Sequence, residues 1–279
     1  MASVIATNNA SVIAQNNLYG AQSALATSVQ RLSSGLRINS AKDDAAGLGI
    51  AERLQAQITG GTVAARNAND AISMVQTAEG GMQEVSAMLQ RMRELATQGN
   101  NDSLNDTQRG YIGTEIVALG AEIDKVSSRT TFNGQSLLDG SMTNGTFQVG
   151  VETTDTVDIS SLMQDVSTST GLTALGTAIT NLDDSSTKLA ALGTAVDTAI
   201  NTVAGYRSSL GAMNNRLDHN IANLQAQTQA LTASRSRITD TDYAAETATL
   251  SKTQVLSQAA TAMLSQANQM PSSVLSLLK

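Results

Sequence analysis

The chain has 279 residues, enough for one or two domains with a sizeable hydrophobic core. Its 17 Lys and Arg against 24 Asp and Glu give a net charge of −7, which disfavours nucleic acid or an anionic membrane surface as the main partner. With one His and no Cys, it lacks the residues for thiol chemistry, disulfides and zinc sites built from Cys and His.

Residues 1 to 30 carry no charged side chain but keep an apolar period. Leu18, Leu25 and Leu32 recur every seven residues, and Val29 and Leu36 follow the last two by four. This spacing predicts an amphipathic helix that buries one face. Because a single helix is marginal in water, the alternatives are a frayed tail or a helix that packs on other helices.

Two further helices are predicted from apolar residues that alternate spacings of three and four, a pattern typical of helix–helix seams. Gly99 is expected to cap the end of the first, and Asn105 or Asp106 the start of the second. The first seam contains Val75, Ala78, Met82, Val85, Leu89, Met92 and Ala96, and the second contains Ile112, Ile116, Leu119, Ile123 and Val126.

The period changes between residues 131 and 160. Phe132-Asn133-Gly134 and Thr143-Asn144-Gly145 are turn signals, and residues 146–151 and 156–159 have the composition of short strands. We expect one or two β-hairpins here. Residues 160–180, rich in Ser, Thr and Gly without a clear period, are expected to form a surface loop or a small cap.

A long heptad repeat follows, and its persistence predicts a coiled-coil helix of roughly 85 Å at ~1.5 Å per residue. Its apolar members are Leu182, Leu189, Val196, Val203, Leu210, Leu217, Leu224, Leu231 and Ile238. The expected fold class is therefore mainly α, a long antiparallel coiled-coil helical rod with a small β-hairpin region.

Residues 253 to 278 form a second uncharged stretch, in which apolar residues stand among Gln, Ser and Ala. An antiparallel arrangement would bring this stretch beside the first. The polymerisation seam, in which the two stretches pack together and onto other copies of the chain, is expected to contain Leu18, Leu25, Val29, Leu32, Leu36, Leu250, Leu264, Val274 and Leu278.

Residues for catalysis, cofactors or metals are sparse, so no catalytic, cofactor-binding or metal site is expected. His219 is the single His and is interpreted as a helix residue that is either solvated or satisfied by a hydrogen-bond partner. The acidic pairs Asp43-Asp44 and Asp183-Asp184 are interpreted as helix caps. No apolar run reaches the ~18 residues that span a membrane, and the N-terminus has no basic region typical of a signal peptide.

Stretches near both ends of the chain resemble the bacterial flagellins. On the N-terminal side these are residues 5–8 (IATN), 28–47 (SVQRLSSGLRINSAKDDAAG), 89–98 (LQRMRELATQ), 122–124 (EID) and 132–134 (FNG). On the C-terminal side they are residues 234–238 (SRSRI), 242–244 (DYA), 266–269 (QANQ) and 274–279 (VLSLLK). The resemblance covers about residues 1–160 and 185–279, in order.

The resemblance implies two domains. Residues 1–43 with 236–279 correspond to the terminal-helix coiled coil called D0, and residues 44–235 to the helical rod D1 with its β-hairpin at about 131–160. Many flagellins insert outer domains between the two halves. Here only about residues 160–185 separate them, which implies little or no outer domain.

The resemblance also implies a structural subunit that is not an enzyme. Flagellins leave the cell unfolded through the flagellar type III channel, assisted by an export chaperone, and polymerise beneath the flagellar cap into the extracellular filament that drives motility. The implied partners are other flagellin subunits, the cap and hook-associated proteins and the chaperone, with no cofactor. Contacts between identical subunits that do not close produce such a helical polymer.

A host partner is implied as well. The segment that Toll-like receptor 5 recognises in many flagellins resembles residues 90–95, with an acidic residue on the neighbouring helix. The matching candidates are Gln90, Arg91, Glu94, Leu95 and Glu115. Arg91 would supply directional hydrogen bonds and Leu95 an apolar anchor. These residues could equally serve packing between subunits.

Three alternatives remain at this point. A hook–filament junction protein would share the terminal helices but form a short ring. A secreted coiled-coil adhesin or effector would bind host surfaces without polymerising. A hydrolase would have to be built on His219 alone.

Overall fold

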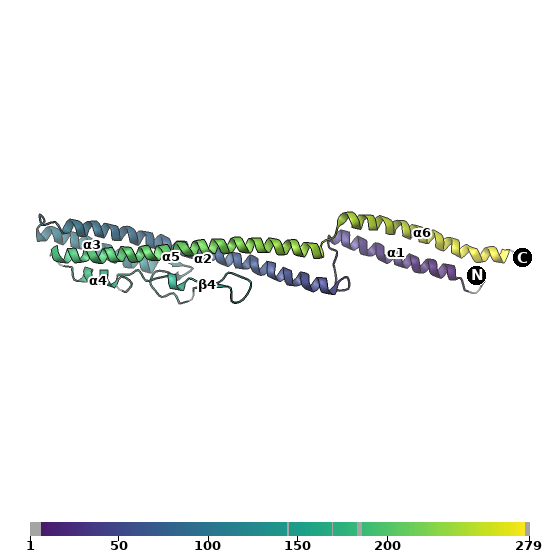
Figure 1. Cartoon of the computed structure of the whole chain (residues 1–279), viewed down its shortest axis with the longest axis horizontal. Coiled ribbons are helices and arrows are strands. Elements are labelled where there is room, and N and C mark those ends of the chain that lie inside the picture. The colour runs from purple at the N-terminus through teal and green to yellow at the C-terminus, as the bar shows by residue number, and fades with distance from the viewer. Residues whose placement is uncertain (1–6, 144, 169, 183–185, 277–279) are drawn as a thin grey trace. The chain divides into compact units, whose positions relative to one another are not determined.

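The computed structural model describes residues 7–143, 145–168, 170–182 and 186–276, and of residues 186, 187 and 271–276 the backbone only. The mainly α fold class is confirmed (Figure 1). The elements are α1 (Asn9–Ser34), α2 (Ala45–Gly99), α3 (Asp106–Arg129), β1 (Thr131–Phe132), β2 (Gln135–Ser136), β3 (Thr146–Gln148), β4 (Thr156–Asp158), the 3-10 turn η1 (Ser160–Leu162), α4 (Thr173–Thr180), α5 (Ser186–Thr239) and α6 (Tyr243–Ser276).

The described residues divide into two compact units. The smaller unit contains those up to residue 56 and from residue 230 onward, and the larger unit contains those of 57–229. Helices α2 and α5 contribute to both. Among the described residues, none of the helices is long and apolar enough to cross a membrane.

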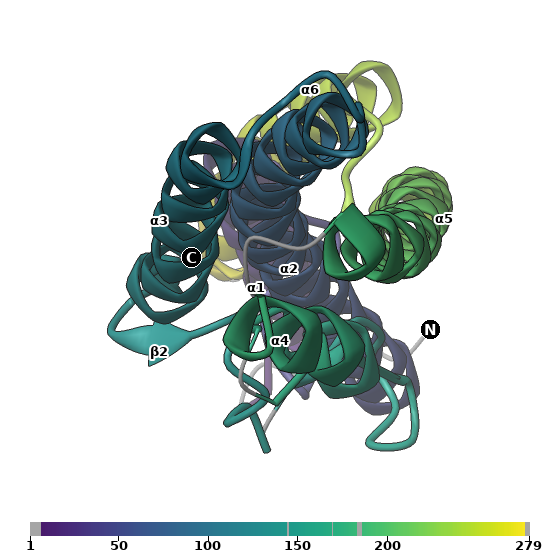
Figure 2. The ribbon, with the colours of Figure 1, turned by 90° about the vertical axis from the view of Figure 1, so that its left-hand side faces the viewer.

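The larger unit is built around α2, α3 and α5, which Figure 2 shows end-on with α4 alongside. Two ion pairs join α2 to α5, Arg93 to Asp197 at 2.6 Å and Glu79 to Arg207 at 3.9 Å. Because the residue numbers in the two pairs change in opposite directions, α2 and α5 run antiparallel.

The predicted heptad is confirmed over most of its length. Its members from Leu189 to Leu217 are at most 1% exposed and belong to the same core as the predicted seam of α2. Leu182 precedes the start of α5 and packs, partly buried, against that core. Leu231 and Ile238 are half-buried.

The β region contains two antiparallel hairpins. In the first, β1 pairs with β2 across Asn133 and Gly134, both of which have positive φ, at 48° and 80°. This is the turn that an Asn-Gly pair favours. In the second, β3 pairs with β4, with Phe147 opposite Val157. Of the other predicted turn signal, Asn144 lies outside the described residues.

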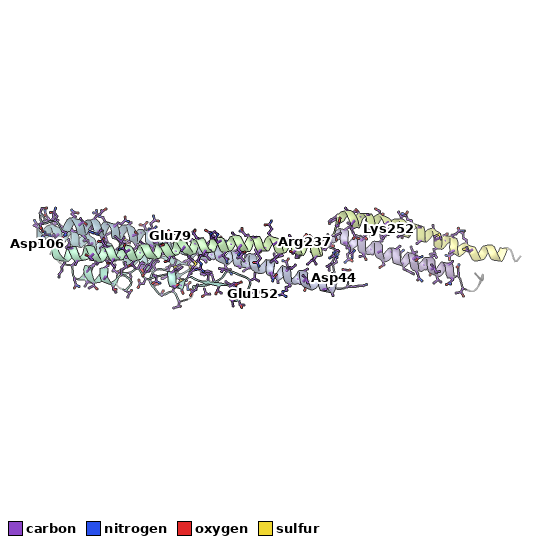
Figure 3. All side chains as sticks on the ribbon, in the orientation of Figure 1. Asp44, Glu79, Asp106, Glu152, Arg237 and Lys252 are labelled. Atoms are coloured by element: carbon purple, nitrogen blue, oxygen red, sulfur yellow. The ribbon has the colours of Figure 1, made fainter. Side chains whose placement is uncertain are left out.

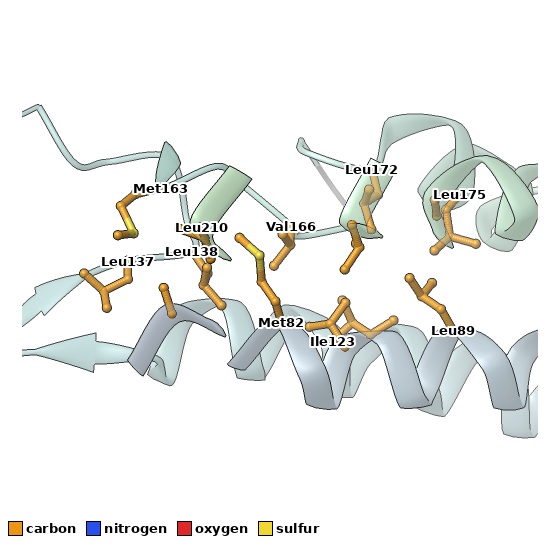
Figure 4. Packing of buried hydrophobic residues seen from close by; sticks show 14 of the residues in the cluster. Met82, Leu89, Ile123, Leu137, Leu138, Met163, Val166, Leu172, Leu175 and Leu210 are labelled. Carbon is orange, nitrogen blue, oxygen red and sulfur yellow. The ribbon is translucent and has the colours of Figure 1, made fainter. Parts of the chain in front are cut away.

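Of the two alternatives for residues 160–180, the surface loop is wrong, and the structure shows the small cap. Val166 and Leu175 are fully buried, and Figure 4 shows Leu172 and Leu175 directed toward Leu89 and Ile123. Asp124 of α3 holds the segment by accepting hydrogen bonds from the backbone N–H of Thr168, at 2.6 Å, and from its hydroxyl. The segment therefore closes one side of the core, although its apolar residues are too few and irregularly spaced to give a period.

The expectation that Gly99 caps α2 is also wrong. Among the described glycines, positive φ occurs at Gly35, Gly134 and Gly140, and Gly99 is the last helical residue. The side chain of Arg109 in α3 caps α2 instead, donating to the carbonyls of Gly99 and Asn101 at 3.2 and 3.1 Å. Asn105 caps α3 as predicted, in a capping box with Gln108.

Gly99 is needed for space, because a Cβ atom there would overlap the side chain of Leu189, which is fully buried. We therefore expect Gly99→Ala to lower the free energy of unfolding by about 1–3 kcal/mol through overpacking. The measurement is urea unfolding followed by far-UV circular dichroism.

Gly205→Ala is the matched control. Gly205 is exposed on α5 and a Cβ atom there has nothing within 4 Å, so the change should stabilise the helix by up to about 1 kcal/mol. Equal effects of the two substitutions would contradict the steric explanation.

Candidate functional site

Helices α1 and α6 lie side by side and antiparallel in the smaller unit (Figure 1). The residues of each helix that face the other recur at spacings of three and four. The most buried of them are small: Ser11, Ala14, Ser28, Thr253 and Ala267, all 8% exposed or less. The seam between the two helices is therefore narrow and poor in apolar surface.

The leucines expected in the polymerisation seam take intermediate positions. Leu18, Leu25 and Leu32 of α1 and Leu250 and Leu264 of α6 are half-buried between the small residues. Leu36 is half-buried just beyond the end of α1, whereas Val29 is 52% exposed on its outer side. The side chain of Val274, and Leu278 as a whole, lie outside the described residues.

A second apolar surface, whose residues are not among the predicted ones, lies on the outside of this helix pair. It is a groove of about 750 Å³ between α1 and α6. Ile13 of α1 and Leu256, Met263 and Met270 of α6 line it and are 48–65% exposed. The seven-residue spacing of the three α6 residues is the signal that could have found it. Alanines and Gly20 supply most of the remaining lining.

Charge is confined to one end of the helix pair. Lys252, labelled in Figure 3, is the last charged residue before Lys279. Arg31 near the end of α1 lies 3.6 Å from Glu246 in the first turn of α6, and this is a partly buried ion pair. Between Asn9 and Gln30 on one side and Thr253 and Met270 on the other, the pair presents no charge.

Asn8 ties the two helices together at the uncharged end. Its Oδ1 atom accepts a hydrogen bond from the backbone N–H of Ser11, which caps α1, and its Nδ2 donates to the carbonyl of Ala267 at 2.8 Å. That carbonyl is available because Pro271, one turn later in α6, has no N–H to donate to it. Ser11 adds a second link through its hydroxyl to Asn268 at 2.7 Å.

The segment that follows α1 and the segment that follows α5 pair with each other through their backbones. Leu36 and Asp240 form an isolated antiparallel bridge, and Gly35 ends α1 with a φ of 72°. Asp43 accepts hydrogen bonds from the Ser40 hydroxyl and from nearby backbone N–H groups, which hold the pKa of this carboxyl below its ordinary value. These contacts give residues 35–43 a defined path.

The two acidic pairs were predicted to cap helices. Asp44 caps α2 by accepting from the N–H of Gly47 at 2.8 Å, as predicted, whereas Asp183 and Asp184 lie outside the described residues. Within the part of the chain that the structure describes, no group of His, Asp and Glu is arranged to hold a metal ion. His219 is exposed on α5.

The candidate receptor residues lie on α2 and α3 in the larger unit. Arg91 donates two hydrogen bonds to Glu115, at 3.0 and 2.9 Å, and one to Glu94 at 3.1 Å. The bonds to Glu115, followed by the bond to Glu94, raise the pKa of Arg91 above its ordinary value. Gln90 is exposed beside them, but Leu95 is 2% exposed and its side chain is not presented at the surface of a single subunit.

Two models of one protein family match this chain, one toward each end. Residues 5–143 match the bacterial flagellin N-terminal helical region, and residues 192–278 match the bacterial flagellin C-terminal helical region. Flagellin of Bacillus subtilis (strain 168) is 42% identical to this chain over 98% of each.

Two solved structures are also similar. Bacillus cereus flagellin is 33% identical, with a TM-score of 0.49 over 57% of this chain and 88% of that chain. A flagellar hook-associated protein from Vibrio parahaemolyticus is 17% identical, with a TM-score of 0.57 over 71% of this chain and 100% of that chain. At that identity the second likeness concerns the fold alone.

Asn8 offers a test of the α1–α6 pairing. Asn8→Asp keeps the oxygen that caps α1 but replaces the Nδ2 donor with an oxygen that faces the Ala267 carbonyl. We expect amide hydrogen exchange in α1 and in α6 near residue 267 to become about tenfold faster or more, because a buried acceptor loses its donor.

Asn9→Asp is the control for this test. It adds the same charge at the same helix end, where it favours the helix dipole, on an exposed side chain. Equal exchange rates in the two variants would show that the Asn8 amide does not hold the helices together.

Proposed function

Because this chain belongs to the bacterial flagellin family and is a structural subunit of the flagellar filament, we propose how its copies assemble. Flagellins polymerise, so copies of this chain contact one another in the filament. The observation that carries the mechanism is the α1–α6 pair, which is uncharged over most of its length and keeps an apolar groove open to solvent.

In this mechanism the helix pair belongs to the D0 domain, assigned to residues 1–43 and 236–279, and is the main contact between subunits. The half-buried leucines hold α1 to α6 within a subunit, and the groove receives an apolar helix face of another copy. A surface of exposed Ile, Leu and Met side chains without charges suits a helix surrounded by protein better than one facing water. Contacts of this kind, repeated without closing, extend a helical polymer.

The remaining family properties belong to the proposal. The chain would be exported through the flagellar type III channel with a flagellin chaperone, lie outside the cell, and contact the cap and hook-associated proteins at the filament ends. It would have no catalytic role, and residues 44–235 would form D1 with little or no outer domain. The absence of Cys supports this route, because a chain without disulfides can pass a narrow channel unfolded.

A second proposed partner is host Toll-like receptor 5, at the surface formed by Gln90, Arg91, Glu94 and Glu115. Support comes from Arg91, whose guanidinium is held in place by two carboxylates while half of its side chain remains exposed. A positioned guanidinium loses little conformational freedom on binding and is a frequent hot spot in protein interfaces. Leu95 would support this surface from the core.

Leu25→Glu tests the assembly mechanism. The substitution puts a charge into the half-buried seam, and we expect the subunit concentration needed for seeded elongation to rise about tenfold or more. Electron microscopy of filaments grown on sheared seeds gives the readout, and far-UV circular dichroism should show that the larger unit still melts as before. Leu25→Met, which keeps size and apolarity, should elongate normally.

Two outcomes would count against the mechanism: normal elongation of the Leu25→Glu chain, or loss of the larger unit's melting transition in that chain. Growth of the unaltered protein into short rings instead of long filaments would favour the hook–filament junction alternative.

Arg91→Ala tests the receptor proposal. We expect activation of reporter cells that express Toll-like receptor 5 to require about tenfold more protein or beyond, because a hot-spot arginine is worth ~2 kcal/mol. Arg129→Ala removes a more exposed arginine from the end of α3 and should leave activation unchanged. A receptor response that Arg91→Ala leaves intact would place the contact elsewhere.

A further inference from the structure

The methionines that the structure describes fall into two groups that differ in exposure. The sequence has 10 Met, no Cys and no Trp, so the thioether is its most readily oxidised side chain. In the larger unit Met74, Met82, Met92, Met142, Met163 and Met213 are 8% exposed or less, and Met88 is partly buried against the core. Met263 and Met270, in α6, are 65% and 57% exposed.

Both exposed methionines line the groove between α1 and α6. They lie seven residues apart, and Leu256 precedes them by a further seven, so the three form one stripe on one face of the helix. The burial pattern thus directs an oxidant to the surface through which we propose that subunits join, and away from the core of the larger unit.

We propose that Met263 and Met270 form a reversible oxidation site that decides whether a free subunit can join the filament, with a peroxide as the oxidant. This inference rests on the proposed assembly through the groove. It assigns a chemical control to that surface, which the assembly mechanism alone does not require.

The reaction is a two-electron oxidation. The thioether sulfur attacks one oxygen of hydrogen peroxide, the O–O bond breaks, and a sulfur–oxygen double bond forms. The sulfur loses two electrons, and the other oxygen leaves as water after taking the proton of the transferred hydroxyl. A methionine sulfoxide reductase with a thiol reductant reverses the step.

Oxidation changes the surface in a direction that opposes assembly. The sulfoxide is a strong hydrogen-bond acceptor on a side chain that was apolar. The apolar helix face of the other copy, which enters the groove in the proposed mechanism, offers it no donor. Burying an acceptor without a partner weakens the contact, whereas the free subunit keeps the oxygen in water at no cost. Oxidised subunits should remain folded and soluble but fail to add to a filament end.

The first experiment maps the oxidation. Purified monomer is exposed to limiting hydrogen peroxide, and peptides are analysed by mass spectrometry for the addition of one oxygen atom. We expect Met263 and Met270 to be oxidised before Met82 and Met92, which are fully buried. Equal rates at all four positions would overturn the proposed site.

The second experiment measures seeded elongation before and after the same peroxide treatment. The unaltered chain should need about tenfold more subunit to elongate once both sulfurs are oxidised, as expected for burial of an unpaired polar group. A chain with Met263→Leu and Met270→Leu keeps apolar side chains of similar size and should elongate with or without peroxide. Met263→Gln with Met270→Gln imitates the polar sulfoxide and should elongate poorly without any oxidant.

Met88→Leu is the matched control and should stay as sensitive to peroxide as the unaltered chain, because it leaves the groove unchanged. Treatment of the oxidised chain with the reductase should restore elongation. The proposal is overturned if the doubly oxidised chain elongates normally, or if the double leucine chain loses elongation with peroxide as the unaltered chain does.

The outcomes of these experiments distinguish a failure of this inference from a failure of the proposed function. Failure of the untreated chain to elongate would contradict assembly itself, whereas the peptide map would still report whether the two exposed sulfurs are oxidised first. Normal assembly that is insensitive to their oxidation would contradict only the control proposed here.

Discussion

A helix whose buried face consists of alanine, serine and threonine gains little free energy by burying it. Burial is worth about 25 cal/mol per Å² of apolar surface, and small side chains remove little such surface from water. The seam between α1 and α6 is of this kind, with its leucines left half-buried. The pair therefore retains apolar surface that only further contacts can cover, and the features of the smaller unit follow from that deficit.

The larger unit has the opposite composition. Leucine, isoleucine, valine and methionine side chains, with several alanines, form one continuous core from α2, α3, α5 and residues 137–175. Asp124 of α3 ties the segment before α4 to this core by accepting hydrogen bonds from Thr168. Ion pairs on its surface, including Arg93 with Asp197, are exposed and contribute little to stability. The larger unit therefore buries most of its large apolar side chains within a single subunit, without contacts from another copy.

Sequence periodicity predicted the strongly amphipathic elements well. The heptad of α5, the seams of α2 and α3, the Asn105 cap and the Asn133-Gly134 turn all depend on local spacing or local chemistry, which a sequence carries directly. The errors arose where the deciding contact is distant. Gly99 is dictated by Leu189 from another helix, and the segment containing Val166 and Leu175 is buried by tertiary packing that its composition does not reveal. The candidate surfaces were only partly predicted, because the residues that line the groove carry no more charge than those of the seam, and charge therefore does not distinguish the two.

The proline of α6 has a consequence for alignment. A seam of small residues and leucines repeated every three and four positions opposes sliding of one helix along the other by a heptad only weakly, since most residues would again meet a small or apolar neighbour. The two ends of the pair forbid it: a slip would leave the Ala267 carbonyl, which Pro271 has freed, without the Asn8 amide, and would separate Arg31 from Glu246. The backbone N–H that Pro271 lacks thus selects one register of α1 against α6 from alignments that the seam alone would leave nearly equal.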